Sequence, residues 1–404
     1  MKPTPPSVVA RIEAFNAGRD PVRLHLKYEA MRRDAFSFLR GTCHLFYEDL
    51  DPGLFPDAPL VWCCGDLHLQ NFGTYRGDNR LTYFDLNDFD EACLAPATWD
   101  LVRFLASILV GGRTLGMNGK VIRKLETAFL DGYATALSGG KALWLERATS
   151  QGQIRTLLAR LKRRTQKKFL AARTTLAKGR RKLHLDGTRA LALQPGEREM
   201  LTAFLKRFAR THKHPERFQL VDAARRIAGN GSLGLPRFAL LVEGYGSPHG
   251  NFLLDLKVET GSAVLRSHAL PQPGWGSEAE RVTHIQRHVQ AIPPALLAPV
   301  EIDGRSWVLR ELMPTEDRLE ISKWADDVEG FTAAVRTLGE VVAWGNLRAA
   351  GRRGAALPDD LMRFGTDRDW AIPLLQAARD AARRTEEHWH EFLAWSPNVA
   401  KITK

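Results

Sequence analysis

Two stretches of the chain decide its fold: VWCCGDLHLQN at residues 61–71 and NDFDEACLAPATWDL at residues 87–101. The apolar run over residues 58–64 predicts a buried strand, and the glycine after it predicts a turn. Asp66 then lies at a strand end, and Asn71 and Asp88 follow after a short loop and a hairpin. Chemistry on a Mg²⁺-bound phosphate needs one carboxylate that orients a hydroxyl and an oxygen-rich pair that holds the metal. Asp66 suits the first role, and Asn71 with Asp88 suits the second.

GDLHLQN resembles the catalytic loop of the aminoglycoside and choline phosphotransferases, which are relatives of protein kinases. In that pattern the tripeptide HGD is followed by an asparagine five residues after its aspartate. Asp66 and Asn71 keep this spacing, whereas Cys64 replaces the histidine. The phosphotransferase resemblance covers only about residues 60–110 and the later glycine loop.

NDFDEACLAPATWDL is similar to the metal-binding motif of the same families, in which a proline and then a helix-opening aspartate follow the metal ligand. Asp88, Pro96 and Asp100 match this pattern, with the proline shifted by about one position. The resemblance implies that Asp66 is the catalytic base, that Asn71 and Asp88 ligate Mg²⁺, and that Asp100 braces the catalytic loop from the start of a helix.

The chain also resembles, over most of its length, a family of uncharacterised bacterial proteins that is grouped with kinase-like folds. The segments that carry this likeness are FLRG (38–41), GDLHLQNFG (65–73), NDFDE (87–91) and GNGSLG (229–234). The likeness singles out Arg40, which we expect to neutralise phosphate charge near the metal loop. A salt bridge that locks the N-terminal helix to the core is the alternative for Arg40. Asp90 is a third candidate metal ligand, with Asp85 as the alternative.

GNGSLG is a complete G-x-G-x-x-G motif. In a dinucleotide-binding fold this motif opens a helix, but here the strand-like run FALLVEG follows it. A strand, a glycine loop and a second strand form the kinase arrangement, in which the loop covers the nucleotide phosphates. Glycines let the backbone approach phosphate and present bare N–H groups. We therefore expect Gly229, Gly231, Ser232 and Gly234 to bind ATP.

Lys257 lies in the apolar run FLLDLKVE, on the third predicted strand after residue 216. We expect it to bind the α- and β-phosphates, and a lysine that protects a sheet edge is the alternative. Its ion-pair partner is expected to be Glu280 on the following helix, ahead of Glu278 and Glu259.

In kinases the glycine loop and the lysine precede the catalytic aspartate, whereas here they follow it. Either the glycine loop belongs to a separate domain or the fold is circularly permuted, and permutation fits more of the sequence. We predict an α+β, two-lobed, permuted kinase-like fold. Residues 1–215 would form the large helical lobe, residues 216–325 the small β-rich nucleotide lobe, and residues 326–404 C-terminal helices that pack on the large lobe. The backbone from Glu311 to Met313 would meet the adenine edge.

The predicted elements follow from periodicity and turn residues. They are helices up to residue 57, a hairpin at 72–86, a run of helices from 99 to about 215, three strands within 223–258, a helix at 277–292, a hairpin at 299–312, and helices from about 326.

The charge of the chain is concentrated in one segment. The net charge is +12, and residues 155–182 hold twelve Lys or Arg residues and no acid. The apolar residues of this segment recur at roughly helical spacing, which predicts a basic amphipathic helix or helix pair. A solvated helix face and a surface for an anionic partner, such as nucleic acid, are both open.

Composition narrows the class of protein. With 44% hydrophobic and 26% charged residues the chain has the balance of a folded globular protein. It has no apolar run long enough to span a membrane, so we expect no membrane-spanning helix. Its four cysteines include an adjacent pair and show no CxxC spacing, so we expect a reduced, cytoplasmic protein without a cysteine zinc site.

These observations predict an ATP- and Mg²⁺-dependent phosphotransferase that moves the γ-phosphate to a hydroxyl acceptor whose identity the sequence leaves open. The acceptor is expected to be anionic if the basic segment contacts it. The alternatives are AMP transfer on the same fold, a nucleotide-binding pseudokinase, and a basic adaptor for nucleic acid. GDLH also resembles the GDxH of metallophosphoesterases, but the later GNH that those enzymes need is missing.

Overall fold

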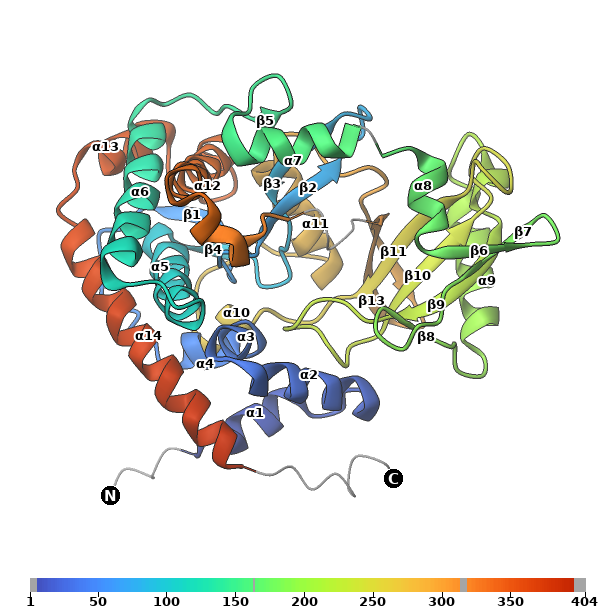
Figure 1. The fold of residues 1–404 in the computed structure, drawn as a ribbon, viewed down its shortest axis with the longest axis horizontal. Coiled ribbons are helices and arrows are strands. Elements are labelled where there is room, and N and C mark those ends of the chain that lie inside the picture. The colour runs from blue at the N-terminus through green and yellow to red at the C-terminus, as the bar shows by residue number, and fades with distance from the viewer. Residues whose placement is uncertain (1–5, 163, 313–317, 396–404) are drawn as a thin grey trace.

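Two hydrophobic cores divide the chain into a large and a small lobe (Figure 1). The computed structural model describes residues 6–162, 164–312 and 318–395. Helices and antiparallel sheets are combined within it, so the α+β class that the sequence predicted is confirmed.

The large lobe is mainly helical. Its helices are α1 (Val8–Asn16), α2 (Pro21–Arg33), α3 (Ala35–Gly41), α4 (Cys43–Glu48), α5 (Ala97–Thr114), α6 (Gly119–Ser138), α7 (Gly152–Lys162), the 3-10 helix η2 (Ile321–Asp326), α12 (Val328–Ala349), α13 (Pro358–Thr366) and α14 (Ala371–Ala394). Its strands are β1 (Leu60–Cys63), β2 (Phe72–Arg76), β3 (Thr82–Leu86), β4 (Cys93–Pro96) and β5 (Leu145–Glu146). The predicted strand before Asp66 and the predicted hairpin at 72–86 are both confirmed.

Helix α5 is the centre of the large lobe. Residues 97–112 are all buried, and the helix packs against α3, α6 and α14. A helix that is apolar on every side is stable only inside a core. The first turn of α5 carries Asp100, and the central position of the helix fixes that side chain against the loop after β1.

The small lobe is built on one antiparallel sheet with the strand order β12-β13-β11-β10-β9-β8. Its elements are β8 (Ala190–Leu191), α9 (Glu197–Ala209), the 3-10 helix η1 (Pro215–Phe218), β9 (Leu220–Arg226), β10 (Arg237–Val242), β11 (Phe252–Val258), β12 (Ala298–Ile302) and β13 (Arg305–Glu311). The predicted strands within 223–258 and the hairpin at 299–312 are confirmed. The sheet and its covering helix α9 begin before residue 216.

The two faces of this sheet have different roles because side chains alternate along a strand. Phe238, Leu240, Val242, Leu254, Leu256 and Val258 form one face and pack with α9 in the smaller core. Asp255 and Lys257 therefore lie on the opposite face, which is directed toward the loop after β3 through the ion pairs of Lys257. Helices α10 (Ala263–Ser267) and α11 (Glu278–Val289) follow β11 and contribute apolar residues to the larger core.

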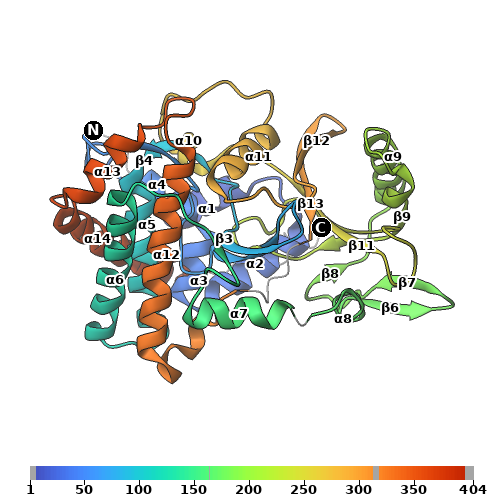
Figure 2. The same ribbon diagram turned by 90° about the horizontal axis from the view of Figure 1, so that it is seen from above.

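The region between α6 and α9 differs from the predicted run of helices. Helix α8 (Gln166–Ala171) is followed by a hairpin of β6 (Thr174–Ala177) and β7 (Arg180–Leu183), so the basic segment 155–182 is only half helical. Lys178 and Gly179 adopt φ values of 48° and 75°, and two left-handed residues make the tight turn that joins such strands. The predicted helix pair is found as α7 and α8, but the prediction was wrong for residues 172–182 because it ignored this turn. Figure 2 shows the hairpin at the far end of the small lobe.

The first and last described helices meet on the surface of the large lobe. The backbone N–H of Val8 donates to the Glu391 carboxylate at 2.9 Å, and Phe392 packs with Val8 and Ile12 in one apolar cluster. The described ends of the chain are therefore close neighbours. None of the helices within the described ranges is both long enough and apolar enough to cross a membrane.

Candidate active site

The loop after β1 holds its shape through one glycine. Gly65 adopts a φ of 80°, and a Cβ at this position would lie 2.1 Å from the carbonyl oxygen of Glu91. Any other residue would clash with that backbone and would be strained at this φ. Gly65 thus lets the Asp66 loop pack directly on the NDFDE segment.

Asp100 ties this loop to the large-lobe core. Its Oδ2 accepts a hydrogen bond from Cys64 N–H at 2.8 Å, and its Oδ1 accepts one from Gly65 N–H at 3.1 Å. Burial raises the pKa of Asp100 to about 6, although the two N–H donors oppose the rise. These are the contacts that a brace at this position needs, and Cys64, which replaces the histidine of the phosphotransferase pattern, takes part through its backbone.

Asp66 has one carboxylate oxygen anchored and the other directed at the cavity. Arg103 donates to Oδ1 from Nε at 3.0 Å and from Nη2 at 2.8 Å. Oδ2 lies 3.9 Å from Nε2 of His68. Burial raises the pKa of Asp66, and the charge of Arg103 partly opposes it. A fixed carboxylate with a raised pKa and one open oxygen suits the work of a general base.

Asn71 connects the two acidic segments. Its Oδ1 accepts from Asp88 N–H at 2.9 Å, and its Nδ2 donates to the carbonyl oxygens of Asp66 at 2.9 Å and Asp88 at 3.3 Å. The amide thereby fixes the distance between the two aspartates. Its oxygen retains one lone pair for a metal.

Asp88 and Asp90 differ in their surroundings. The Asp88 side chain is 46% exposed and lines the cavity, whereas Asp90 forms an ion pair with Lys257. Burial acts to raise the pKa of Asp88, but the charges of Lys257 and Arg310 outweigh it and hold the pKa below its ordinary value. Asp85 pairs with Arg348 at 3.0 Å outside this cavity, so the structure does not bring it to the site.

The donor set suits a hard cation. The oxygens of Asn71, Asp88 and Asp90, the three expected metal ligands, are the type that Mg²⁺ prefers, although Asp90 is paired with Lys257. In the described part of the chain, however, no three His, Cys, Asp or Glu side chains converge closely enough to hold a metal by themselves. Mg²⁺ at this site would therefore take its remaining ligands from phosphate oxygens and water, as is usual for this ion.

The glycine loop reaches the same cavity in part. Gly229, Gly231 and Ser232 line it together with the acidic residues. Gly234 does not, since it adopts a φ of 94° and its carbonyl oxygen accepts from Asp20 N–H at 2.9 Å. The loop therefore faces the cavity with its first half and packs on the N-terminal helices with its second.

Buried cations of the N-terminal helices hold the glycine loop. Arg19 donates to the carbonyl oxygens of Gly231 at 2.7 Å and Leu233 at 2.9 Å. Lys27, which is completely buried, donates to the same Gly231 oxygen at 2.9 Å and to Asn16 at 3.0 Å. Burial lowers the pKa of Lys27 well below its ordinary value, and the charge of Arg19 lowers it further. These contacts fix the backbone of the loop against the large lobe.

Lys257 reaches three carboxylates of the cavity wall from the small lobe. Its Nζ lies 3.9 Å from Asp88 Oδ1 and 4.0 Å from Glu259 Oε1, besides the ion pair with Asp90. Glu280, the expected partner, accepts from Gly276 N–H at 2.7 Å and caps the start of α11 instead. Glu259 and Asp90 are therefore the acids that lie beside Lys257. Helix α11 is capped by Ser277, and the acids of its first turn stabilise the start of the helix instead.

The two residues expected near adenine are not in this cavity. Glu311 pairs with Arg80 at 3.0 Å and lines a separate hollow of about 630 Å³ that also includes Phe169 and Leu312. Met313 lies outside the described residues.

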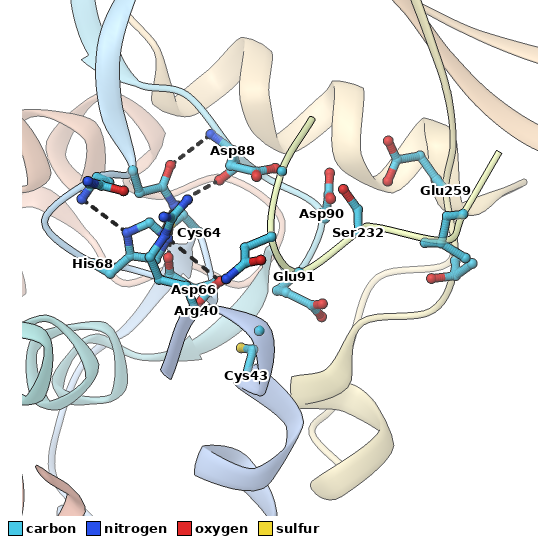
Figure 3. A pocket seen from close by; sticks show the side chains of 18 of the residues that line it. Arg40, Cys43, Cys64, Asp66, His68, Asp88, Asp90, Glu91, Ser232 and Glu259 are labelled. Carbon is cyan, nitrogen blue, oxygen red and sulfur yellow. Dashed lines mark hydrogen bonds and ion pairs between the residues drawn. The ribbon is translucent and has the colours of Figure 1, made fainter. Parts of the chain in front are cut away.

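The acidic segments that contain Asp66 and Asp88 and the first half of the glycine loop line one cavity of about 850 Å³ between the lobes. Figure 3 shows Arg40, Asp66 and His68 together on one side and Ser232 and Glu259 on the other, with Asp88 and Asp90 between them.

A comparison with protein-family models assigns the chain to a family. The family model described as an uncharacterized protein conserved in bacteria (DUF2252) matches residues 19–395. The chain belongs to this family. The resemblance to an uncharacterised bacterial family is therefore confirmed, and the matched range includes every residue that lines the cavity except Phe15. No curated protein matches the chain, and no solved structure does.

Sequence reasoning missed several cations that organise the site. Arg103 lies three residues after Asp100, so both project from one face of α5. Arg23, Lys27 and Met31 recur every fourth residue on α2 and are all buried. A cation on the buried stripe of an amphipathic helix is the signal that could have revealed Lys27, because such a group needs a buried acceptor.

We expect Lys27→Met to loosen the glycine loop. The change keeps the side-chain volume but removes the donor to Gly231, and one such hydrogen bond is worth about 1–2 kcal/mol. Hydrogen exchange measured by mass spectrometry should become roughly 5- to 30-fold faster over residues 229–234, while β10 and β11 keep their rates. Lys120→Met, at an exposed position of α6, is the matched control. Unchanged exchange in the loop would contradict the clamp.

Proposed function

We propose that this protein is an ATP- and Mg²⁺-dependent phosphotransferase that moves the γ-phosphate to a hydroxyl acceptor. The observation that carries the proposal is the 3.9 Å approach of Lys257 Nζ to the carboxylate of Asp88, which lines one cavity together with Asp66 and the first half of the glycine loop. Phosphoryl transfer requires a base, metal-binding oxygens, a phosphate-binding loop and a cation in one place. Asp66, Asn71, Asp88 and the glycine loop line this cavity, and Lys257 adjoins it through Asp88 and Asp90.

A circularly permuted kinase-like fold accounts for the order of these parts. From β9 onward the chain runs strand, glycine loop, strand, lysine strand, helix and hairpin, which is the arrangement of a kinase nucleotide lobe. The catalytic loop and the metal motif precede it instead of following it. The contact between Val8 and Glu391 supports permutation, because in an unpermuted chain the C-terminal helices would continue into the N-terminal helices at this point.

The proposed mechanism assigns the chemistry to few groups. Asp66 Oδ2 would accept the proton of the attacking hydroxyl while Arg103 holds the carboxylate in place. Lys257 would exchange its contact with Asp90 for the α- and β-phosphates. Asp88 and Asn71 would hold Mg²⁺, which supplies charge neutralisation for the transferring phosphoryl group. Positioning and charge stabilisation are most of what this reaction needs from a protein.

AMP transfer from the same cavity is the second candidate. Beyond Lys257, on the same sheet face, three arginines converge on the single buried carboxylate of Asp255. The positive charge of this cluster would suit a triphosphate bound with its polarity reversed. Mass spectrometry of the modified acceptor separates the candidates, because one gains a phosphoryl group and the other an adenylyl group.

A pseudokinase function and a nucleic-acid partner are two further proposals. A pseudokinase would bind Mg²⁺ and ATP in this cavity without turnover. A nucleic-acid partner would use the exposed cations of segment 155–182. We place the protein in the cytoplasm, because all four cysteines are free and buried, which fits a reducing compartment.

Thermal unfolding with ATP and Mg²⁺, separately and together, tests the nucleotide site. Ligand at one hundred times its Kd stabilises the folded state by about 2.7 kcal/mol. We expect the wild type to be stabilised most by the two together, and Asp88→Asn to lose that joint effect because its metal ligand is weakened. No stabilisation of the wild type by any combination would contradict the proposed function.

A further inference from the structure

Three side chains with hydrogen-bond donors gather beside Asp66, and the described part of the chain offers them no acceptor. Arg40 on α3, Arg318 before η2, and His68 line the same end of the cavity. The Arg40 Nε is buried and has no hydrogen-bond partner among the described residues. Neither Arg40 nor Arg318 forms an ion pair within 6–162, 164–312 or 318–395, so the salt bridge expected as the alternative for Arg40 is not seen there.

The carboxylates that line the cavity are mostly paired with donors other than Arg40 and Arg318. Each except Asp88 has its own donor: Asp66 is held by Arg103, Asp90 and Glu259 by Lys257, and Glu91 by the backbone N–H of Ala263. Asp88 alone remains for two guanidinium groups, and Lys257 also approaches it. At this end of the cavity the three guanidinium groups of Arg40, Arg103 and Arg318 therefore face only the two carboxylates of Asp66 and Asp88.

His68 adds a neutral donor to the pair. Gln70 N–H donates to its Nδ1 at 3.1 Å, which places the ring hydrogen on Nε2. Its Nε2 is 3.9 Å from Asp66 Oδ2, too far for a hydrogen bond, and this donor is free for a ligand.

We propose that Arg40, Arg318 and His68 bind a phosphate group of the acceptor, so that the acceptor is a hydroxyl compound that already carries a phosphate. Two guanidinium groups match the charge of a phosphate monoester, and their planar donor sets fit its oxygens. Arg40 and His68 lie beside Asp66, whereas Ser232 and Glu259 lie farther along the cavity (Figure 3). The inference rests on the proposed function, because it needs Asp66 as the base for a neighbouring hydroxyl.

Calorimetry with inorganic phosphate tests this site in the full-length protein. Phosphate is titrated into protein alone and into protein saturated with Mg²⁺ and the β,γ-methylene analogue of ATP, which fills the terminal-phosphate position and transfers nothing. We expect phosphate to bind in both states. Arg40→Gln and Arg318→Gln should each weaken it about 10- to 100-fold, the usual value of a charge-assisted hydrogen bond. Arg363→Gln, a change at an exposed arginine of α13, should have no effect.

The outcomes separate the possible sources of the phosphate. If the analogue abolishes phosphate binding and Arg40→Gln weakens ATP but not ADP, the site belongs to the nucleotide and the acceptor proposal is overturned. Absence of phosphate binding in the wild type, or binding that neither variant alters, overturns it as well. If phosphate binds in an Arg40-dependent way while ATP does not bind at all, the anion site stands and the phosphotransferase proposal fails.

Discussion

Replacement of Asp66 by asparagine is expected to lower the rate of phosphoryl transfer by about 10²- to 10⁴-fold, which is the usual contribution of a general base. The amide oxygen can still accept from Arg103, so the loop should keep its shape, but the side chain can no longer take the hydroxyl proton. Affinity for Mg²⁺ and ATP should change little. The rate is measured as ADP formed from Mg²⁺ and ATP, with a bacterial small-molecule extract as the source of acceptor.

Asp78→Asn is the control for this variant, because it makes the same change at an exposed turn between β2 and β3. The control should keep the wild-type rate. A wild-type rate in Asp66→Asn itself would remove Asp66 from the chemistry, whatever the cavity binds.

The largest loss of stability is expected from Asp255→Asn. The carboxylate is buried between strands and accepts hydrogen bonds from Nε and Nη2 of Arg237 at 2.8 Å and 2.5 Å. It also forms ion pairs with Arg226 at 2.8 Å and Arg310 at 3.7 Å. Removing its charge leaves buried guanidinium groups without a counter-charge, and such a break costs about 3–5 kcal/mol. Chemical denaturation should show this decrease in the free energy of unfolding, whereas Asp78→Asn should show none.

The same carboxylate predicts a pH dependence. Burial acts to raise the pKa of Asp255, but Arg226 and Arg237 outweigh it and hold the pKa well below its usual range. The folded protein therefore keeps Asp255 ionised at a pH where the unfolded chain binds a proton there. Its contribution is complete above the ordinary aspartate pKa of about 3.9 and decreases as the pH falls below it. Asp255→Asn should flatten this part of the stability profile, and an unchanged profile would contradict the assignment.

The small-lobe strands were predictable because their alternation and glycine turns are local signals. Residues 237–242 and 252–258 are short apolar runs between turn residues, and both became central strands. The stretch after α8 was not predictable in the same way. The prediction gave more weight to the helical spacing of a few leucines than to the turn at Lys178 and Gly179. The β-branched Thr174 and Thr175 favour a strand there.

Within the site, residues near each other in sequence were predicted better than distant partners. Asp66, Asn71, Asp88 and Asp100 meet through loops of fixed length, so their spacing already limits their geometry. The partner of Lys257 was expected on the next helix, yet that helix supplies a cap instead.

Long-range partners were the part that spacing could not give. The clamp from Arg19 and Lys27 to the glycine loop joins residues more than 200 positions apart. Only the packing of α1 and α2 beside the small lobe brings them together, and no local pattern encodes that packing.

Hydrogen exchange of the whole chain, with and without Mg²⁺ and the β,γ-methylene analogue of ATP, tests the central claim most directly. One nucleotide bound between the lobes should slow exchange in residues 64–71 and in residues 227–236, with the same half-saturating concentration for both segments. Protection of only one segment, or different half-saturation for the two, would contradict a single site that both lobes build.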